Sequence, residues 1–172
     1  TAQGHRHRTL GLPTSDADEE RLAAELRSAV EDEPALRILH IAALDVDAGR
    51  AKRPEAGNAS SMRSLLRMQH RVLDGTQRLF RAAASADLRT PIWVTTRGAQ
   101  RVLETDSVSP VQTSLWGFCR AAALEYPQVW GGLADVSGDA TGTQAHAEWS
   151  RLIGQIVASP RGEDQIALRG QV

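Results

Sequence analysis

The sequence predicts an α/β fold in which a mostly parallel sheet is flanked by helices on both faces. Short, nearly continuous apolar runs alternate along the chain with longer segments whose apolar residues recur every three or four positions. This order of strands and helices requires right-handed crossovers between parallel strands. The chain has 172 residues, of which 41% are hydrophobic, so it can bury one core without disulfide bonds. We therefore expect one folded unit over residues 1–172.

The first half of the chain predicts an arm, two helices and two strands. Residues 1–8 are polar and charged, as expected of a mobile arm. Ser15 and Asp18 resemble a capping box, which predicts a helix that starts there and ends near Glu31. The elements that follow are a strand over 37–44, a surface loop over 45–60, a helix over 61–86 and a strand over 91–96. The apolar stripe of the long helix comprises Leu65, Leu66, Met68, Val72, Leu73, Leu79 and Phe80.

The second half opens with the best marked helix of the chain. Ser109 is its expected cap, Pro110 its first residue and Gln112 the partner in a capping box, and the helix ends near Tyr126. The remaining elements are a strand over 130–136, a helix over 144–158 and a strand over 165–169. The residues expected to face inward on that helix are Trp149, Leu152, Ile153, Ile156 and Val157.

The charge balance and the apolar runs argue against two classes of partner. Twenty Lys and Arg against 21 Asp and Glu give a formal charge of -1, so no basic field is available to attract nucleic acid or anionic lipid. The longest apolar runs are far shorter than a membrane helix, and the charged start does not resemble a signal peptide. The single cysteine, Cys119, lies among apolar residues and is expected to be a small buried side chain. We therefore expect a cytoplasmic chain with neither nucleic acid nor membrane as partner.

The predicted fold is Rossmann-like, yet the chain lacks the turn that binds a dinucleotide. Neither a GxGxxG sequence nor a Walker A sequence occurs, and Gly98 follows a strand without a helix start directly behind it. Short-chain reductases use a tyrosine as proton donor together with a lysine or asparagine. Tyr126 is the only tyrosine, and the residues four positions away are Ala122 and Trp130. Neither can assist proton transfer, so we interpret Tyr126 as structural.

Other catalytic patterns are also missing from the sequence. A serine nucleophile would need an elbow of the Gly-x-Ser-x-Gly kind, and the chain has none. His5 and His7 are too few to hold a metal in an arm, and His40 is expected to be a core histidine. The other two histidines, His70 and His146, fall on helices without further ligands at metal spacing. We expect no catalytic, cofactor-binding or metal residue in this chain.

The four tryptophans are the most prominent apolar residues. Trp93 and Trp149 are expected in the core. Trp116 and Trp130 lie on a helix and on the strand that follows, where they belong to the core or line an interface with another domain.

Two stretches of the sequence resemble a known family. The residues PIWVTTRGA at 91–99 and SLWGFCRAAALEYPQVWGGLAD at 114–135 are similar to the N-terminal, structural subdomain of the ketoreductase region of type I polyketide synthases. The runs at 38–45 and 164–169 resemble further strands of that subdomain. The resemblance covers most of the chain, from about Ala35 to Val172.

The resemblance implies a truncated Rossmann-like fold that has lost cofactor binding and braces a second, catalytic subdomain. In the family that partner carries the NADPH site and reduces a β-ketoacyl thioester. Further partners implied within the synthase are an inserted enoylreductase, a dehydratase and an acyl carrier protein. This chain starts part-way into the family's subdomain and stops where the catalytic half or an insertion begins, so we expect a fragment of a synthase.

Two alternatives remain open at this stage. One is a scaffold that docks a methyltransferase or a carrier protein instead of a reductase. The other is an independent short-chain reductase with an unusual site around Tyr126.

Overall fold

The computed structural model describes residues 7–45, 59–158 and 163–170. They form one four-stranded parallel sheet with the strand order β1-β2-β3-β4, which confirms the α/β, Rossmann-like class. In chain order the elements are α1 (Asp16–Asp32), β1 (Ile38–His40), a 3-10 turn (Ala42–Asp45), α2 (Ala59–Ser85), β2 (Ile92–Arg97), α3 (Pro110–Glu125), β3 (Trp130–Val136), α4 (Gly142–Ala158) and β4 (Gln165–Ala167). None of these helices is both long and apolar enough to cross a bilayer.

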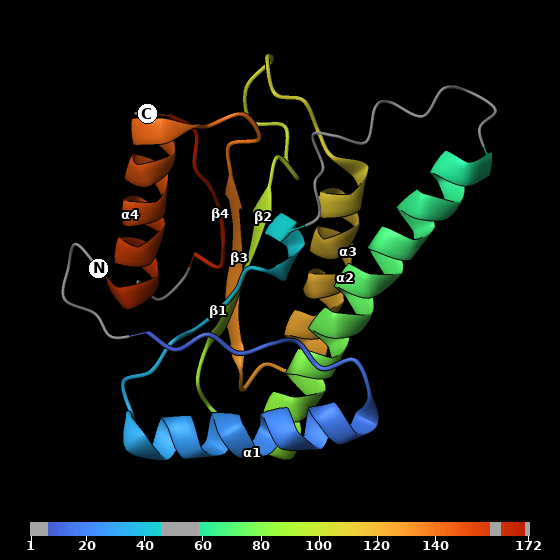
Figure 1. Ribbon diagram of the computed structural model, residues 1–172. Helices are drawn as coiled ribbons and strands as arrows, with labels where there is room; N and C mark the ends of the chain where they lie inside the picture. Colours follow the sequence, from blue (N-terminus) through green and yellow to red (C-terminus); the bar gives the residue numbers. More distant parts are fainter. Residues whose placement is uncertain (1–6, 46–58, 159–162, 171–172) are drawn as a thin grey trace.

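Both faces of the sheet are covered by helices. On β2, Ile92 and Val94 belong to the core cluster that contains residues of α1, α2 and α3, whereas Trp93 between them packs with residues of α4. Such alternation follows from the two-residue period of a strand. In Figure 1 the sheet is seen nearly edge-on, with α2 and α3 on one side and α4 on the other. Helix α1 runs across the end of α2.

The last crossover departs from the expected handedness. The chain steps in one direction from β1 to β4, but α4 lies on the opposite face from α2 and α3. The crossover through α4 therefore has the opposite hand from the two before it, and the expectation of right-handed crossovers throughout is wrong. Uniform handedness would have put all three helices on one face. It would have left Trp93, Ala134 and Val136 exposed to water. Packing beneath α4 buries them and avoids the free-energy cost of exposing apolar surface.

Helix α1 begins as predicted and is tied to α2 by ion pairs. Ser15 is its N-cap, and its hydroxyl oxygen accepts a hydrogen bond from the Asp18 N–H at 3.2 Å. Arg78 of α2 lies 2.7 Å from the carboxylate of Asp16, and Arg81 lies 3.1 Å from that of Glu19. Together with the burial of apolar residues of α1 in the main core, these contacts fix α1 across α2.

The cap of α3 differs from the expectation. Ser109 stands at the N-cap and Pro110 at the first position, but the Ser109 side chain makes no capping hydrogen bond. Gln112 does not complete a capping box. Its amide donates to the Ala43 carbonyl at 2.6 Å and accepts from the Arg97 N–H at 3.3 Å. The Gln112 side chain therefore makes tertiary hydrogen bonds instead of the capping bond that the local pattern predicts.

The two short edge strands and two helix faces also differ from the predictions. The apolar run at 37–44 is a strand only over Ile38–His40, because the chain then forms a 3-10 turn in which the Ala43 carbonyl accepts a hydrogen bond from Gln112. The last strand stops at Ala167. On α4, Leu152 and Ile156 are buried as expected, but Ile153 and Val157 are 38% and 49% exposed; Leu66 of α2 is 48% exposed. Residues 1–6 of the predicted arm, most of the loop over 45–60, and the side chains of Leu65 and Met68 lie outside the described residues.

Neighbouring residues of α4 provide a test of how it packs. Leu152 is fully buried, whereas Ile153 beside it is exposed. We expect Leu152→Ala to lower the free energy of unfolding by about 2 to 5 kcal/mol and Ile153→Ala by roughly 1 kcal/mol or less. Urea denaturation of the two variants measures the difference. Equal losses would contradict the placement of α4.

Candidate functional site

The position where this fold could bind a ligand lies at the carboxyl ends of β2 and β3. The connection from β2 leads to α3 on one face of the sheet, and the connection from β3 leads to α4 on the other. A crevice opens between neighbouring parallel strands whose connections leave toward opposite faces, and ligands of α/β proteins bind there. Any nucleotide site of this chain is expected at this crevice.

The chain's own backbone closes that crevice at the start of the loop after β2. Twelve residues, 98–109, separate β2 from α3, so no helix begins directly behind Gly98. Gly98 has a φ of +61° and faces Gly138, which follows β3. A Cβ on Gly98 would lie 3.3 Å from the Gly138 Cα, which is the close approach that glycine permits. The two connections thus meet backbone to backbone where a pyrophosphate would need to enter.

Asp135 of β3 holds this loop. Its side chain is fully buried, and each carboxylate oxygen accepts two hydrogen bonds. One oxygen accepts from the Thr96 hydroxyl at 2.7 Å and the Ala99 N–H at 2.8 Å. The other accepts from the Gln100 N–H at 3.1 Å and the Arg169 guanidinium at 2.7 Å. A buried carboxylate with this number of donors is satisfied without water or ligand.

Arg169 joins Asp135 to the far end of the loop. Its Nε donates to Asp106 at 2.9 Å, and its Nη2 also donates to the Gln100 carbonyl at 2.7 Å. The N–H of Leu103, the Arg169 guanidinium and the Val102 N–H lower the pKa of Asp106 to about 2. We name Asp135, Arg169 and Asp106 the carboxylate clamp. It ties β3, the residues after β4 and the loop 98–109 together.

A second buried carboxylate fixes the same end of β4. Glu148 of α4 accepts from the Ser137 hydroxyl at 2.5 Å, and from the N–H groups of Ser137 and Gly170 at 2.9 Å each. Burial opposes ionisation of this carboxyl group, but the hydrogen bonds outweigh it and hold the pKa of Glu148 below its ordinary value. The connection after β3, α4 and the residues after β4 therefore form one rigid corner.

The clamp is poorly suited to acid–base catalysis. A general base must reach a substrate proton, and it needs an unoccupied lone pair to accept it. Both oxygens of Asp135 are taken by internal donors, and the Arg169 guanidinium is taken by internal acceptors. The arrangement closes a crevice and rigidifies the ends of three strands.

Residues weighed for catalysis occupy structural positions. The Tyr126 ring stacks on Phe80 with the ring centroids 5.7 Å apart. Cys119 is fully buried, and burial raises the pKa of its thiol to about 12, so it is not a ready nucleophile. His40 is a buried core histidine as expected: its Nε2 lies 2.8 Å from the hydroxyl of Thr76, which itself donates to the Val72 carbonyl. The His40 Nε2 is thus the donor.

The remaining histidines do not form a metal site in the described part of the chain. His7 precedes α1, His70 lies on α2 and His146 lies on α4, and all three are exposed. Among residues 7–45, 59–158 and 163–170, no group of three His, Cys, Asp or Glu could hold a metal ion. His5 lies outside these ranges.

The tryptophans divide between the two faces of the sheet. Trp93 is buried against α4, and the nearby Gly132 (φ +153°) leaves space for its indole, since a Cβ there would lie 2.6 Å from the ring. Trp116 is buried and donates to Thr96 at 2.8 Å, which extends the hydrogen bonds around Asp135 into α3. Trp130 is half-buried, stacks on Phe80 and donates to Asp164. Trp149, expected in the core, is half-buried.

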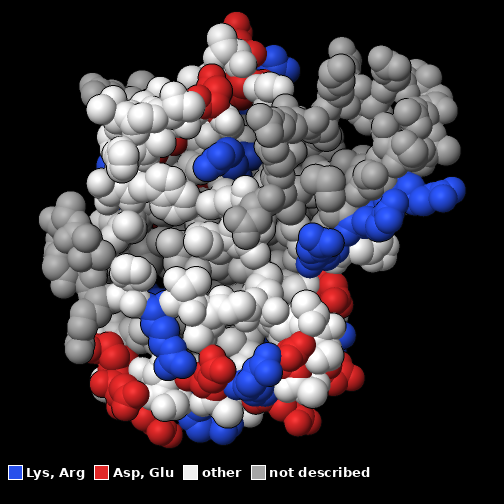
Figure 2. Space-filling view, viewed as in Figure 1, with Lys and Arg blue, Asp and Glu red and all other residues white. Residues whose placement is uncertain are grey.

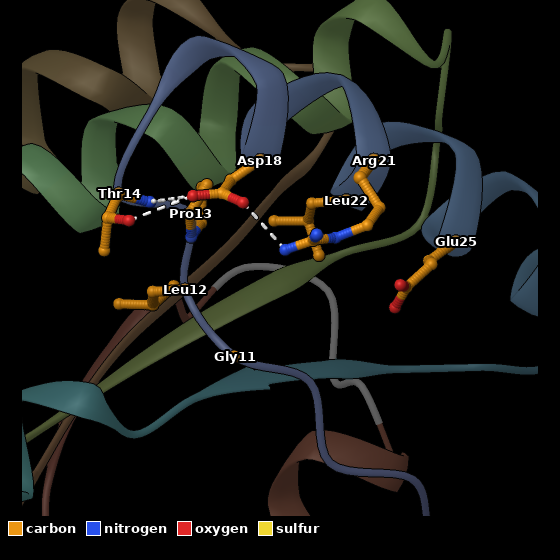
Figure 3. Close-up of a pocket in the computed structure, with 8 residues that line it drawn as sticks. All are labelled: Gly11, Leu12, Pro13, Thr14, Asp18, Arg21, Leu22 and Glu25. Carbon is orange, nitrogen blue, oxygen red and sulfur yellow. Dashed lines mark hydrogen bonds and ion pairs between the residues drawn. The ribbon is translucent and has the colours of Figure 1, made fainter.

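Two surface hollows lie away from the crevice. One, of about 230 Å³, is formed by residues 11–14 and α1, and Figure 3 shows Thr14, Asp18 and Arg21 turned toward one another there. Asp18 there accepts from Thr14 and Arg21, so the polar groups serve the helix start. The other, of about 380 Å³, lies between Gln155 of α4 and residues of β4. Neither contains a pair of groups arranged for catalysis.

The clamp was not among the residues that sequence reasoning selected. Its signal is nevertheless present: Asp135 is a charged residue inside the apolar strand Leu133–Val136, and a buried carboxylate requires a partner. Arg169 directly follows the last apolar run and is the matching cation. Asp106 lies in a loop that shows no sequence pattern, so its contact with Arg169 can be recognised only in the structure.

The buried imidazole of His40 predicts a dependence of stability on pH. Burial lowers its pKa from 6.5 to about 4, so the unfolded chain binds this proton more readily than the folded one. The stabilisation is complete above pH 6.5 and is lost as the pH falls through 4, by on the order of 3 kcal/mol. Chemical denaturation of the wild type and of His40→Gln at pH 7 and pH 4.5 checks this. An equal decline in both proteins would contradict it.

Removal of Arg169 predicts a large loss of stability. Arg169→Met leaves the fully buried Asp135 without its counter-charge, and breaking a buried pair in this way costs about 3 to 5 kcal/mol. Arg120→Met is the control, since Arg120 is exposed and its guanidinium contacts the Gln165 side chain and the face of the Trp116 ring without a buried counter-charge; it is expected to cost roughly 1 kcal/mol or less. Thermal and urea unfolding measure both. A loss at Arg169 no larger than at Arg120 would show that the clamp does not hold the fold.

Comparison with known proteins identifies the family. The family model described as "Polyketide synthase extender module SpnB, Rossmann fold domain" matches residues 3–172. The chain is 43% identical over 98 residues to "Polyketide synthase GfsA" of Streptomyces halstedii, and 41% identical over 95 residues to "Pikromycin polyketide synthase component PikAII" of Streptomyces venezuelae. These matches include 56% and 55% of this chain but 1% and 2% of those proteins. The chain thus spans a small part of the relatives it matches.

Solved structures agree with this identification. One, a C2-type ketoreductase from a modular polyketide synthase, matches with a TM-score of 0.63 and 32% identity over 88% of this chain and 29% of its own. Another, an A1-type ketoreductase, matches with a TM-score of 0.62 and 30% identity over 96% of this chain and 30% of its own. This chain therefore belongs to the SpnB Rossmann fold family, the structural, N-terminal subdomain of the ketoreductase region of modular polyketide synthases.

Proposed function

We propose that this chain is non-catalytic and braces the NADPH-dependent β-ketoacyl reductase of a type I polyketide synthase. The observation that carries the proposal is the closed crevice at the ends of β2 and β3. Loop 98–109 and the carboxylate clamp occupy the place where a Rossmann-like fold binds its ligand. A unit built in this way supplies rigidity and surface rather than chemistry.

The positions of the candidate catalytic residues support the same role. Tyr126 contributes a stacked ring, and Cys119 is buried with a raised pKa. The ketoreductase structures that this chain matches are more than three times as long as the part it aligns with, since it covers 29% and 30% of them. NADPH and the β-ketoacyl thioester would bind to the remainder of such a reductase. We place this reductase in the cytoplasm, with an enoylreductase, a dehydratase and the acyl carrier protein of the synthase as further neighbours.

The test separates bracing from catalysis in the complete ketoreductase region. We expect Arg169→Met to lower the melting temperature and shorten the lifetime of reductase activity on warming, because the clamp is lost. At low temperature it should leave kcat/KM for a β-ketoacyl thioester within about twofold. Tyr126→Phe, which keeps the ring that stacks on Phe80, should change neither quantity. Thermal shift and steady-state kinetics provide the measurements.

Two results would overturn the proposal. Loss of reduction in Tyr126→Phe with an unchanged melting temperature would favour an independent short-chain reductase. Reductase stability that does not respond to Arg169→Met, combined with binding of this chain to a methyltransferase or carrier protein, would favour the scaffold.

A further inference from the structure

The first half of α2 carries a row of arginines on its exposed face. Arg63, Arg67 and Arg71 follow one another at intervals of four residues, and all three are exposed. This spacing places them along one ridge of a helix. In Figure 1 this half of α2 extends away from α3 and the sheet, and Figure 2 shows basic side chains following the same projecting part.

The row is not neutralised within the described part of the chain. No Asp or Glu occurs from residue 56 to residue 73. The first carboxylate on the helix, Asp74, lies 3.3 Å from Arg78 and is directed to that residue. The Arg67 Nε donates to the Arg63 carbonyl at 3.4 Å, a contact within the helix. No carboxylate among the described residues lies within ion-pair distance of the three guanidinium groups.

The row is unfavourable for the isolated helix. Like charges four residues apart repel each other, and positive charge near a helix N-terminus opposes the helix dipole. The first turn of α2 has no acidic residue. A carboxylate-bearing partner would relieve both the repulsion among the arginines and their unfavourable interaction with the helix dipole.

An apolar side chain beside the row indicates a protein rather than a nucleic acid. Leu66 lies three residues from Arg63, so the two are neighbours on the helix surface, and it is 48% exposed. An apolar contact rimmed by charge is typical of protein interfaces, whereas phosphate backbones are held by polar and cationic groups alone. The formal charge of -1 also provides no wider basic field. We propose that Arg63, Leu66, Arg67 and Arg71 form a docking surface for an acidic amphipathic helix on another protein domain.

A designed peptide tests this surface directly. The probe is a fluorescein-labelled helical peptide with Glu at every fourth position and Leu three residues from each Glu. Its binding to the chain is measured by fluorescence anisotropy at about 50 mM NaCl, where charges are weakly screened, and at about 300 mM NaCl, where they are strongly screened. We expect saturable binding that weakens with salt. Arg67→Glu and Leu66→Ser should each weaken it at least about tenfold.

Matched variants control for charge and for exposed leucine. Arg89→Glu changes the net charge by the same amount at another exposed arginine, and Leu124→Ser removes an 85% exposed leucine from α3. Both should bind the peptide like the wild type. Arg67→Glu removes repulsion within α2, so its melting temperature should not fall. The triple variant Arg63→Glu, Arg67→Glu, Arg71→Glu should bind a peptide with Lys in place of Glu, which the wild type should not bind.

Three outcomes would overturn the proposal. They are absence of binding up to about 1 mM peptide, equal effects of Arg67→Glu and Arg89→Glu, and binding of a DNA duplex that Leu66→Ser does not weaken. Each is distinct from failure of the bracing role, because none involves reductase activity.

Discussion

The buried pair of Asp135 and Arg169 is the interaction on which the architecture at the carboxyl ends of the strands depends. Asp135 gathers donors from β2, from the loop after β2 and from the residues after β4, and Arg169 extends the contact to Asp106. Desolvating two charges is expensive, and it is tolerated because nearly every donor and acceptor is satisfied. The same pair that links the ends of three strands also holds the loop that closes the crevice in which related folds bind a nucleotide.

A second constraint is the need to bury both faces of a sheet that contains few strands. Apolar side chains alternate on β2 and β3, so each face demands a helix. The reversed hand of the crossover through α4 meets this demand, and Glu148 then anchors α4 to Ser137 and Gly170. Packing of Trp93 and the exit of the chain after β4 are therefore set by the same helix. Buried hydrogen bonds hold the fold at this corner, whereas the first half of α2 extends away from α3 and the sheet (Figure 1).

Sequence reasoning succeeded where one local signal determined the structure. The Ser15 cap, the alternation of strands and helices and the core position of His40 each follow from periodicity or turn chemistry. It failed where tertiary contacts compete with local ones. Gln112 matched a capping box but bonds to Ala43, and Ile153 matched an inward stripe but lies on the exposed edge of α4. Handedness of the last crossover was beyond reach, because it depends on which face remains uncovered. The clamp was missed because its members are far apart in the sequence.

The central claim is that the ends of β2 and β3 are closed by the protein itself, and on it rests our proposal that NADPH binds to another part of the ketoreductase region. The most direct measurement is a crystal structure of the complete ketoreductase region grown with NADPH. The account predicts the cofactor outside this subdomain, with Asp135 still paired with Arg169 and Gly98 against Gly138. Cofactor density against the ends of β2 and β3, with the pair broken and loop 98–109 displaced, would contradict it.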